Sequence, residues 1–288
     1  MEHRIKLWVG MGAWLLASAS PVALASGSSD EILQQAGGTA LAQAIPPSHG
    51  MKHGGEGGEG GEGGEEGGHA DPFADASPDA AFTGRLLLIK GHLRIGKELY
   101  DLGRIDDALP HYLHPVEEIY EDIEPGLAAR GIAPFRASLD RLAASVKAKQ
   151  PKEEIAKQQE RVTAALDAAM RKVDGKTQAA PSFVAEVAVL ALRTAAEEYA
   201  EAVEDGRIAN GVEYQDSRGF VLAAQDYLTA HATALRTKDS DAYGDMLAAV
   251  ETMRGAYPSV LPPVAAKIQA GEVEAAASRV ELLASRFR

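Results

Sequence analysis

The sequence predicts an all-α protein built as a tandem duplication of two four-helix-bundle-like units. From Ser77 onward apolar residues recur at spacings of three and four, the period of an amphipathic helix, and no stretch alternates as a strand would. Glycine and proline clusters divide this part of the chain into about eight helical segments. The third observation is an internal repeat, which sets the domain boundaries.

Two segments of the helical part recur in the same order. ELYDLGRIDD (98–107) recurs as EAVEDGRIAN (201–210), and VKAKQPKEEIAKQQERV (146–162) recurs as VAAKIQAGEVEAAASRV (264–280). Because both pairs keep their order, we expect two related units, 77–178 and 179–288. Each Gly-Arg-Ile segment should then form the same helix–helix corner, and the two units should superpose.

Residues 1–25 have the pattern of a signal peptide. Arg4 and Lys6 precede a short apolar run, which ends in Ala23-Leu24-Ala25, a sequence that a signal peptidase accepts. Glycine and proline interrupt the run, which is too short for a membrane-spanning helix. We therefore expect an exported, periplasmic protein without membrane insertion after cleavage.

Residues 26–76 read as a disordered, low-complexity tether rather than a domain. Their centre is a near-triplet repeat of glycine and glutamate, which has no apolar surface to bury and cannot offset the entropy of ordering. His49, His53 and His69 flank this repeat. Two interpretations stay open: a low-affinity scavenger of divalent metal, or a solubilising linker whose histidines are incidental.

The composition of the chain excludes several kinds of binding site and catalytic site. The chain has no cysteine, which excludes disulfides, thiol nucleophiles and thiolate metal sites. Its formal net charge of −13 disfavours nucleic acid and anionic membrane surfaces and tolerates cationic ligands. The motifs of zinc proteases, serine hydrolases, P-loop proteins and dinucleotide-binding proteins do not occur. We therefore expect no enzymatic activity.

The segment HYLHPVEEIYEDIE (111–124) carries the strongest candidate site. His111 and His114 are spaced i, i+3, so they lie on one helical face. In the second copy EYQD places Glu213 and Asp216 at the corresponding corner with the same spacing. Nitrogen and carboxylate donors together suit iron, zinc, manganese or copper better than calcium.

An ordinary solvated face is the competing interpretation of this segment. Leu109, Leu113 and Val116 form an apolar face, and the histidines with Glu118 lie opposite, as they would on any exposed helix. Two prolines, Pro110 and Pro115, should bend the helix where the histidines sit. A bend there favours a shaped corner over a plain surface helix.

His92 is a separate candidate. It shares a helical face with Leu88 and Ile95, so its ring points into the core, where a histidine is commonly a satisfied structural residue. Gly91 and Gly96 beside it permit close helix approach, which could bring the other two histidines near. On the corresponding helix of the second copy, Glu197 and Glu198 are candidates for outer positions around the same site.

The stretch LHPVEEIYEDIEPGLAARGIAPFRASLDRLAASV resembles the imelysin-like family of periplasmic helical proteins, which includes the soluble component of bacterial ferrous-iron uptake systems. The hallmark of that family is a His-x-x-Glu pair, which would be His114 and Glu117 here. The resemblance implies two related four-helix bundles and metal binding for transport.

Together these observations predict an exported metal-binding protein of metal uptake or homeostasis. Iron is the first choice of metal, with copper or zinc as alternatives, and the expected protein partner is a membrane permease or an oxidase. The competing hypothesis is a non-catalytic helical interaction scaffold without a metal site. The candidate metal ligands are His92, His111, His114, Glu117, Glu118, Glu213 and Asp216.

Overall fold

The computed structural model describes residues 71–177 and 179–288. The signal peptide expected at 1–25 and the tether up to residue 70 lie outside the described residues. In the part that is described, no helix has both the length and the apolar character needed to cross a membrane.

The described residues are helical almost throughout, which confirms the all-α class. The first elements are α1 (Pro78–Asp101), α2 (Ile105–His114), the π-helical turn η1 (Pro115–Ile119), α3 (Tyr120–Ala129), α4 (Arg136–Lys147) and α5 (Lys152–Thr177). They are followed by α6 (Pro181–Ala202), β1 (Val203–Glu204), β2 (Arg207–Ile208), α7 (Gly211–Ala230), α8 (Ala232–Arg254), α9 (Ala270–Ala284) and the 3₁₀ turn η2 (Ser285–Phe287). Helices α2, η1 and α3 run on as one bent helix. Most helix ends coincide with glycine or proline positions, whereas α7 and α8 divide at His231, where the sequence has neither.

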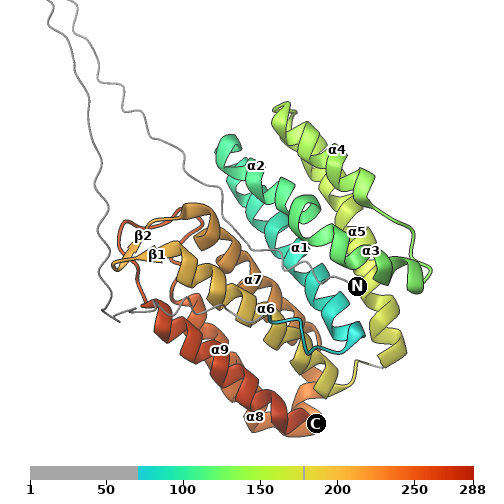
Figure 1. Cartoon of the computed structure of the whole chain (residues 1–288), viewed down its shortest axis with the longest axis vertical. Coiled ribbons are helices and arrows are strands. Elements are labelled where there is room, and N and C mark those ends of the chain that lie inside the picture. Colours follow the sequence, from blue (N-terminus) through green and yellow to red (C-terminus); the bar gives the residue numbers. More distant parts are fainter. Residues whose placement is uncertain (1–70, 178) are drawn as a thin grey trace, which may run out of the picture. The chain divides into compact units, whose positions relative to one another are not determined.

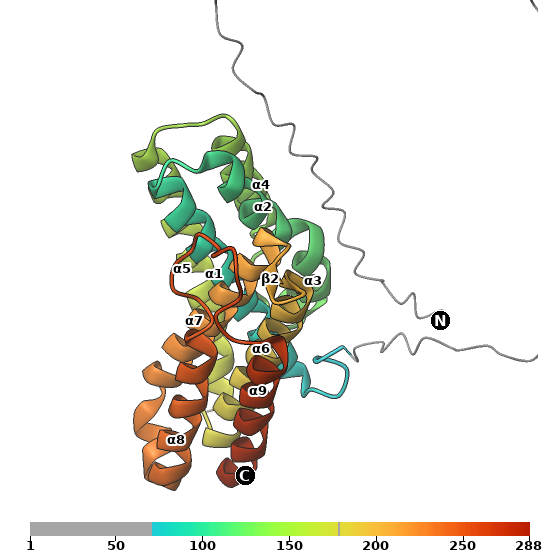
Figure 2. The ribbon, with the colours of Figure 1, turned by 90° about the vertical axis from the view of Figure 1, so that its left-hand side faces the viewer.

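Helices α1, α6 and α7 form the centre of the helical part. Helix α1 packs against α2, α5, α6 and α7, while α7 packs against α6, α1 and α8 (Figure 1). Helices α4 and α5 lie side by side beyond α1 and α2, and α8 and α9 lie together beyond α6 and α7 (Figure 2). The central helices therefore bring the two halves of the chain into direct contact.

Helix α1 begins where the sequence predicts. Ser77 is its N-cap, and its side-chain oxygen accepts a hydrogen bond from the Ala80 amide at 3.3 Å. Pro78 occupies the first helical position, where the missing amide hydrogen has no helical acceptor to lose.

Helices α1 and α7 approach each other at a pair of glycines. A Cβ atom built on Gly219 would lie 2.7 Å from the carbonyl oxygen of Gly91, and one built on Gly91 would lie 2.7 Å from Cδ1 of Phe220. The close approach expected at Gly91 is therefore confirmed. His92 follows this contact directly, and Asp216 lies about one turn before Gly219.

The expectation that both Gly-Arg-Ile segments form the same corner is wrong. Gly103, with φ of +77°, ends α1 and leads into α2 by a short turn. In the second segment Asp205 and Gly206 have φ of 50° and 72°, and they connect the antiparallel strands β1 and β2. An Asp-Gly pair with two positive φ angles favours a tight hairpin, which the Leu-Gly pair of the first segment cannot form as readily.

The second recurring pair also differs in structure. Val146 is buried in α4, whereas Val264 is 83% exposed and precedes α9 in a stretch without helix. The sequence similarity therefore does not extend to matching local folds. The division into units 77–178 and 179–288 stays a prediction.

Candidate metal centre

The carboxylates of the centre come from the first turns of α7. Asn210 caps this helix: its side-chain oxygen accepts hydrogen bonds from the amides of Val212, at 3.0 Å, and Glu213. This cap sets the start of the helix, and the i, i+3 spacing then places Glu213 and Asp216 on one face.

The histidines of α2 lie beside a bend, as the two prolines predict. Pro110 stands inside α2, and Pro115 opens the π-helical turn η1. A π turn holds more residues than an α turn and commonly marks a functional position in a helix. In this geometry Glu118 faces His114, with 3.8 Å between Oε2 and Nδ1, while Glu117 is exposed and outside the cluster.

The solvated-face interpretation is wrong for His111. This side chain is fully buried, and that of His114 is 17% exposed. Helix α7 covers the face that would be wet on an isolated helix. The polar face of α2 is thus part of the contact between the two halves of the chain.

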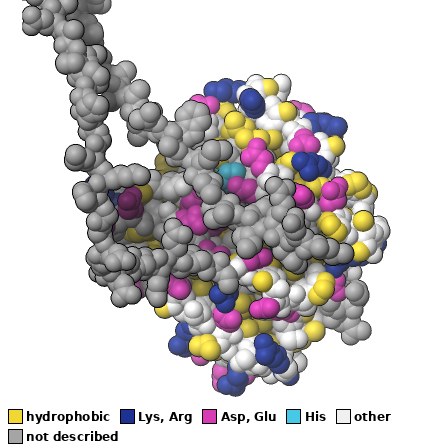
Figure 3. Space-filling model, in the orientation of Figure 1, with side chains coloured by type: hydrophobic (Ala, Val, Ile, Leu, Met, Phe, Trp, Pro, Cys, Tyr) yellow, Lys and Arg dark blue, Asp and Glu magenta, His cyan; other side chains and the backbone are white. Residues whose placement is uncertain are grey.

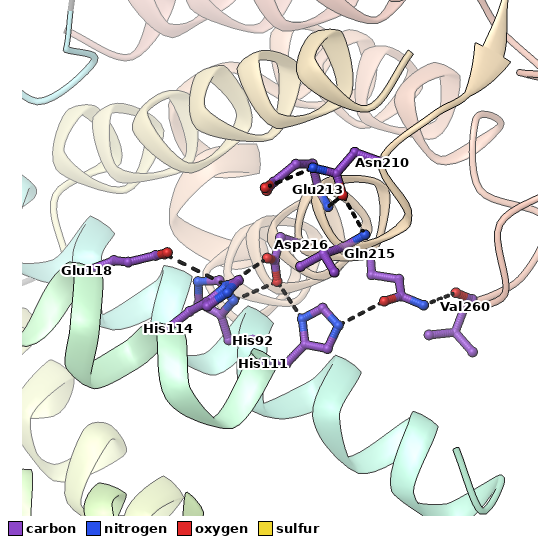
Figure 4. A network of polar contacts seen from close by, with 10 residues as sticks. His92, His111, His114, Glu118, Asn210, Glu213, Gln215, Asp216 and Val260 are labelled. Atoms are coloured by element: carbon purple, nitrogen blue, oxygen red, sulfur yellow. Dashed lines mark hydrogen bonds and ion pairs between the residues drawn. The ribbon is translucent and has the colours of Figure 1, made fainter. Parts of the chain in front are cut away.

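Asp216 is the centre of the cluster (Figure 4). Its Oδ1 lies 2.6 Å from Nδ1 of His92 and 2.7 Å from Nδ1 of His111. Its Oδ2 lies 3.0 Å from Nδ1 of His114. Three histidines from α1 and α2 therefore share one carboxylate from α7, whose side chain is 2% exposed.

His111 has an acceptor at each ring nitrogen. Nε2 lies 2.9 Å from Oε1 of Gln215, and the amide nitrogen of Gln215 donates to the carbonyl oxygen of Val260 at 3.1 Å, which orients the amide. Because neighbouring side chains engage both of its ring nitrogens, His111 has no nitrogen free for a metal in this arrangement.

His92 differs from His111 because one of its nitrogens has no partner. Nδ1 contacts Asp216, whereas Nε2 is buried without a hydrogen-bond partner. Burial lowers the pKa of His92, although the charge of Asp216 acts to raise it. A neutral ring that donates from Nδ1 presents a bare lone pair at Nε2, the form in which histidine binds a metal ion.

The charges around His114 act in the opposite direction. Burial alone would lower the pKa of His114, but its hydrogen bond to Asp216 and the charges of Asp216, Glu118 and Glu213 raise that pKa from 6.5 to about 9. Burial raises the pKa of Glu118 from 4.5 to about 7, against the charge of His114. For Asp216, burial acts to raise the pKa, but the surrounding histidines hold it well below its usual range.

The donor set fits a transition metal ion. Ligand atoms of His92, His114 and Glu118 all lie within 4.8 Å of one another, and those of His92, His111 and Asp216 do so as well. Two imidazoles and a carboxylate suit iron, zinc or copper. Asp216 accepts hydrogen bonds from the Nδ1 atoms. It would therefore hold the rings in place, as a carboxylate that does not itself bind the ion does around many metal sites. We therefore favour His92, His114 and Glu118 as the residues that would hold the ion.

Of the candidate ligands, the structure brings five into this cluster: His92, His111, His114, Glu118 and Asp216. Glu213 lies on the same face of α7 and belongs to a second group with Glu198 and Glu201. Gln215 was missed, although it is the polar residue between Tyr214 and Asp216 in the EYQD motif. Nothing in a helical pattern shows that an amide there reaches a histidine of another helix.

Comparison with known proteins gives a match over part of the chain. Residues 174–286 match the family model described as the iron permease-associated 4-helix bundle domain. This range contains α6, α7, α8 and α9, and hence Asp216 and Gln215, whereas the three histidines lie before it. No curated protein and no solved structure matches the chain. The imelysin-like resemblance is not shown by these comparisons. Residues 174–286 are thus similar to a four-helix-bundle domain associated with iron permeases.

Proposed function

We propose that this chain is an exported, periplasmic protein that binds a divalent transition metal, iron first, for uptake through a membrane permease. His92, His114 and Glu118 would hold the ion, and Asp216 would orient the rings. The proposal assigns the chain binding and delivery and no catalytic step. Copper and zinc remain alternatives for the metal, and an oxidase remains an alternative partner.

The observation that carries the proposal is the lone pair of His92. A buried polar atom without a hydrogen-bond partner lowers the stability of the folded protein by roughly 1–3 kcal/mol. Nε2 of His92 is such an atom, and it belongs to a group of three candidate ligands. A bound metal ion would give this nitrogen its partner.

Iron is favoured by the match of residues 174–286 to an iron permease-associated domain. The family model covers the half of the chain that supplies Asp216, so the orienting carboxylate comes from the matched bundle. Ferrous iron also binds carboxylate and imidazole ligands. The match supports a permease as partner because the matched domain is named for that association.

The charge of His114 would make binding depend on proton release. With a pKa raised to about 9, His114 carries a proton at neutral pH, and a metal ion must displace it. Affinity should therefore rise with pH up to about 9 and fall in acid. Acidic conditions would favour release of the ion.

The test is equilibrium dialysis of the full chain against Fe²⁺ without oxygen, and against Zn²⁺, followed by elemental analysis. His92→Gln and His114→Gln should each remove the tightly bound ion. The matched control is His231→Gln, because His231 is also half-buried beside a carboxylate, that of Asp174, but lies outside the cluster. The predicted tether is present in all variants, so its own binding cancels in the comparison.

Loss of the bound ion in both cluster variants, with retention in His231→Gln, supports the proposal. Equal metal content in wild type and both cluster variants contradicts it. In that case the histidines form a hydrogen-bonded structural cluster, and the interaction-scaffold hypothesis takes its place.

A further inference from the structure

We propose a second cation site in this chain, formed only by carboxylates: Glu198 and Glu201 of α6 with Glu213 of α7. Ligand atoms of the three side chains all lie within 4.8 Å of one another. A site of oxygen ligands alone takes a hard divalent cation such as Mn²⁺ or Ca²⁺ more readily than copper. This carboxylate site is separate from the proposed function, and it would bind its cation whether or not the histidine site holds a metal ion.

Glu198 is the reason to treat this cluster as a site rather than as an acidic surface. Its side chain is 6% exposed, and its Oε2 is buried without a hydrogen-bond partner. A carboxylate is seldom buried without a cation or a set of donors, because its desolvation is expensive. Burial and the neighbouring Glu213, which shares a hydrogen bond with Glu198, raise the pKa of Glu198 well above its usual range, and a bound cation would take the place of the proton held there.

The three carboxylates form a path from solvent into the protein. Glu201 is exposed, Glu213 is half-buried and Glu198 is buried. On the face drawn in Figure 3, acidic side chains gather around a histidine side chain, over the region where the two halves of the chain meet. A cation would therefore meet this group first at Glu201, its exposed member.

Helix geometry and side-chain hydrogen bonds hold these side chains in place without help from an ion. Glu198 and Glu201 are spaced i, i+3 on α6 and so lie on one face of that helix. Opposite them, Glu213 accepts a hydrogen bond from the side-chain amide of Asn210 at 3.3 Å. The buried Ser217 hydroxyl donates to the carbonyl oxygen of Ala195 and so ties α7 to α6 close to the cluster. A prearranged carboxylate group binds a cation with little ordering penalty.

The second site would lie next to the histidine centre. Glu213 and Asp216 project from the same face of α7, and the charge of Glu213 acts on both His114 and Glu118. The two sites would therefore lie beside the same face of α7 and hold ions of different preference. A cation captured by the exposed carboxylates would then lie beside the histidine ligands.

The test measures Mn²⁺ binding to the full chain by electron paramagnetic resonance, which counts free Mn²⁺ directly. Glu198→Gln keeps the size and shape of the side chain, and Glu201→Gln changes an exposed residue, so both should fold. Each should weaken Mn²⁺ binding by at least about tenfold, the scale on which loss of a single supporting group weakens a metal site. Glu204→Gln is the control, because Glu204 is exposed just beyond α6 and belongs to no ligand group.

The His92→Gln variant separates this inference from the proposed function. Mn²⁺ binding that persists in His92→Gln but weakens in the two glutamate variants supports the carboxylate site, whether or not iron binds the histidines. Mn²⁺ binding that is unchanged in Glu198→Gln and Glu201→Gln overturns it. Mn²⁺ binding that is lost only in His92→Gln also overturns it, because the ion then belongs to the histidine centre.

Discussion

The two halves of the chain contribute different chemistry to one centre. Helices α1 and α2 supply three histidines, the turn η1 supplies Glu118, and α7 supplies Asp216, the carboxylate that all three histidines contact. The family match covers only the half that supplies Asp216. The three favoured ligands lie in the first half, but Asp216 of the second half orients their rings, so the arrangement depends on the packing of α1 and α2 against α7.

This division explains the different states of the three histidines. All three contact Asp216 through Nδ1, yet only His111 has an acceptor at its other nitrogen, and only His92 has a buried nitrogen without a partner. The second half of the chain thus determines which histidine is engaged at both ring nitrogens and which has a nitrogen available to a metal. Breaking the contact between the halves should affect all three at once.

The largest effect is expected from Asp216→Ala. Removing one member of a buried ion pair generally costs about 3–5 kcal/mol, because the remaining charge has no partner. The variant should unfold at markedly lower denaturant concentration than wild type. Asp226→Ala, on the same helix, is the control: Asp226 pairs with Arg94 at the surface, and its loss should change stability by less than about 0.5 kcal/mol. Equal effects of the two substitutions would show that the cluster does not hold the halves together.

A smaller loss is expected from Gly219→Ala. Its Cβ would meet the carbonyl oxygen of Gly91 at 2.7 Å, so α1 and α7 must separate, and overpacking of this kind costs about 1–3 kcal/mol. The separation should also weaken metal binding, since Asp216 moves with α7. Gly244→Ala is the matched control: nothing lies within 4 Å of its added Cβ, and alanine should stabilise α8 slightly. Thermal unfolding checks both, and a Gly219→Ala protein as stable as wild type would contradict the close crossing.

Part of the pH dependence of stability should come from His114. The pKa of His114 is raised from 6.5 to about 9, so its contribution is fully present below pH 6.5 and is lost as pH rises through about 9. The metal-free protein should therefore melt at lower temperature at pH 9 than at pH 6.5. His92 adds nothing to this trend, because its pKa is lowered and its effect falls in acid.

His114→Gln should reduce that decline in melting temperature. The decline should not vanish, since the hydrogen bond to Asp174 also raises the pKa of His231. An unchanged decline in His114→Gln would show that His114 is not charged at neutral pH in the folded protein.

The smallest effects compare the two helix starts. Ser77 caps α1 and Asn210 caps α7, and replacing either cap by alanine should cost about 1 kcal/mol. Only Asn210→Ala should also weaken metal binding, because this cap positions the first turns of α7, which carry Glu213 and Asp216. Denaturant melts measure the loss of stability, and dialysis with elemental analysis measures the loss of metal binding. Equal losses of metal binding in Ser77→Ala and Asn210→Ala would show that the cap of α7 has no special role in positioning the metal centre.

Much of the centre could be predicted from local patterns. The i, i+3 spacing of His111 and His114, the two prolines beside them and the glycine next to His92 all indicated residues that the structure brings together. Asp216 was a candidate because its motif occupies a similar place in the second half. Each of these signals concerns spacing along one helix, which a sequence shows directly.

What the sequence did not predict depends on contacts between helices. The crossing of α1 and α7 places Asp216 among all three histidines, and no periodicity in either helix specifies that crossing. Glu118, at i, i+4, faces His114, whereas Glu117 of the His-x-x-Glu pair is exposed, and the sequence offered both. The Asp-Gly turn that forms the hairpin was hidden by its similarity to the Leu-Gly corner of the first half.

Anomalous X-ray diffraction from crystals of the metal-loaded full chain tests most directly whether the two halves form one metal centre. The data would be collected on both sides of the absorption edge of the bound iron or zinc. The account predicts a peak bounded by His92 and His114, with Glu118 as the carboxylate ligand and Asp216 hydrogen-bonded behind the rings. Metal peaks elsewhere on the chain, with the histidine cluster free of metal in the same crystals, would contradict it.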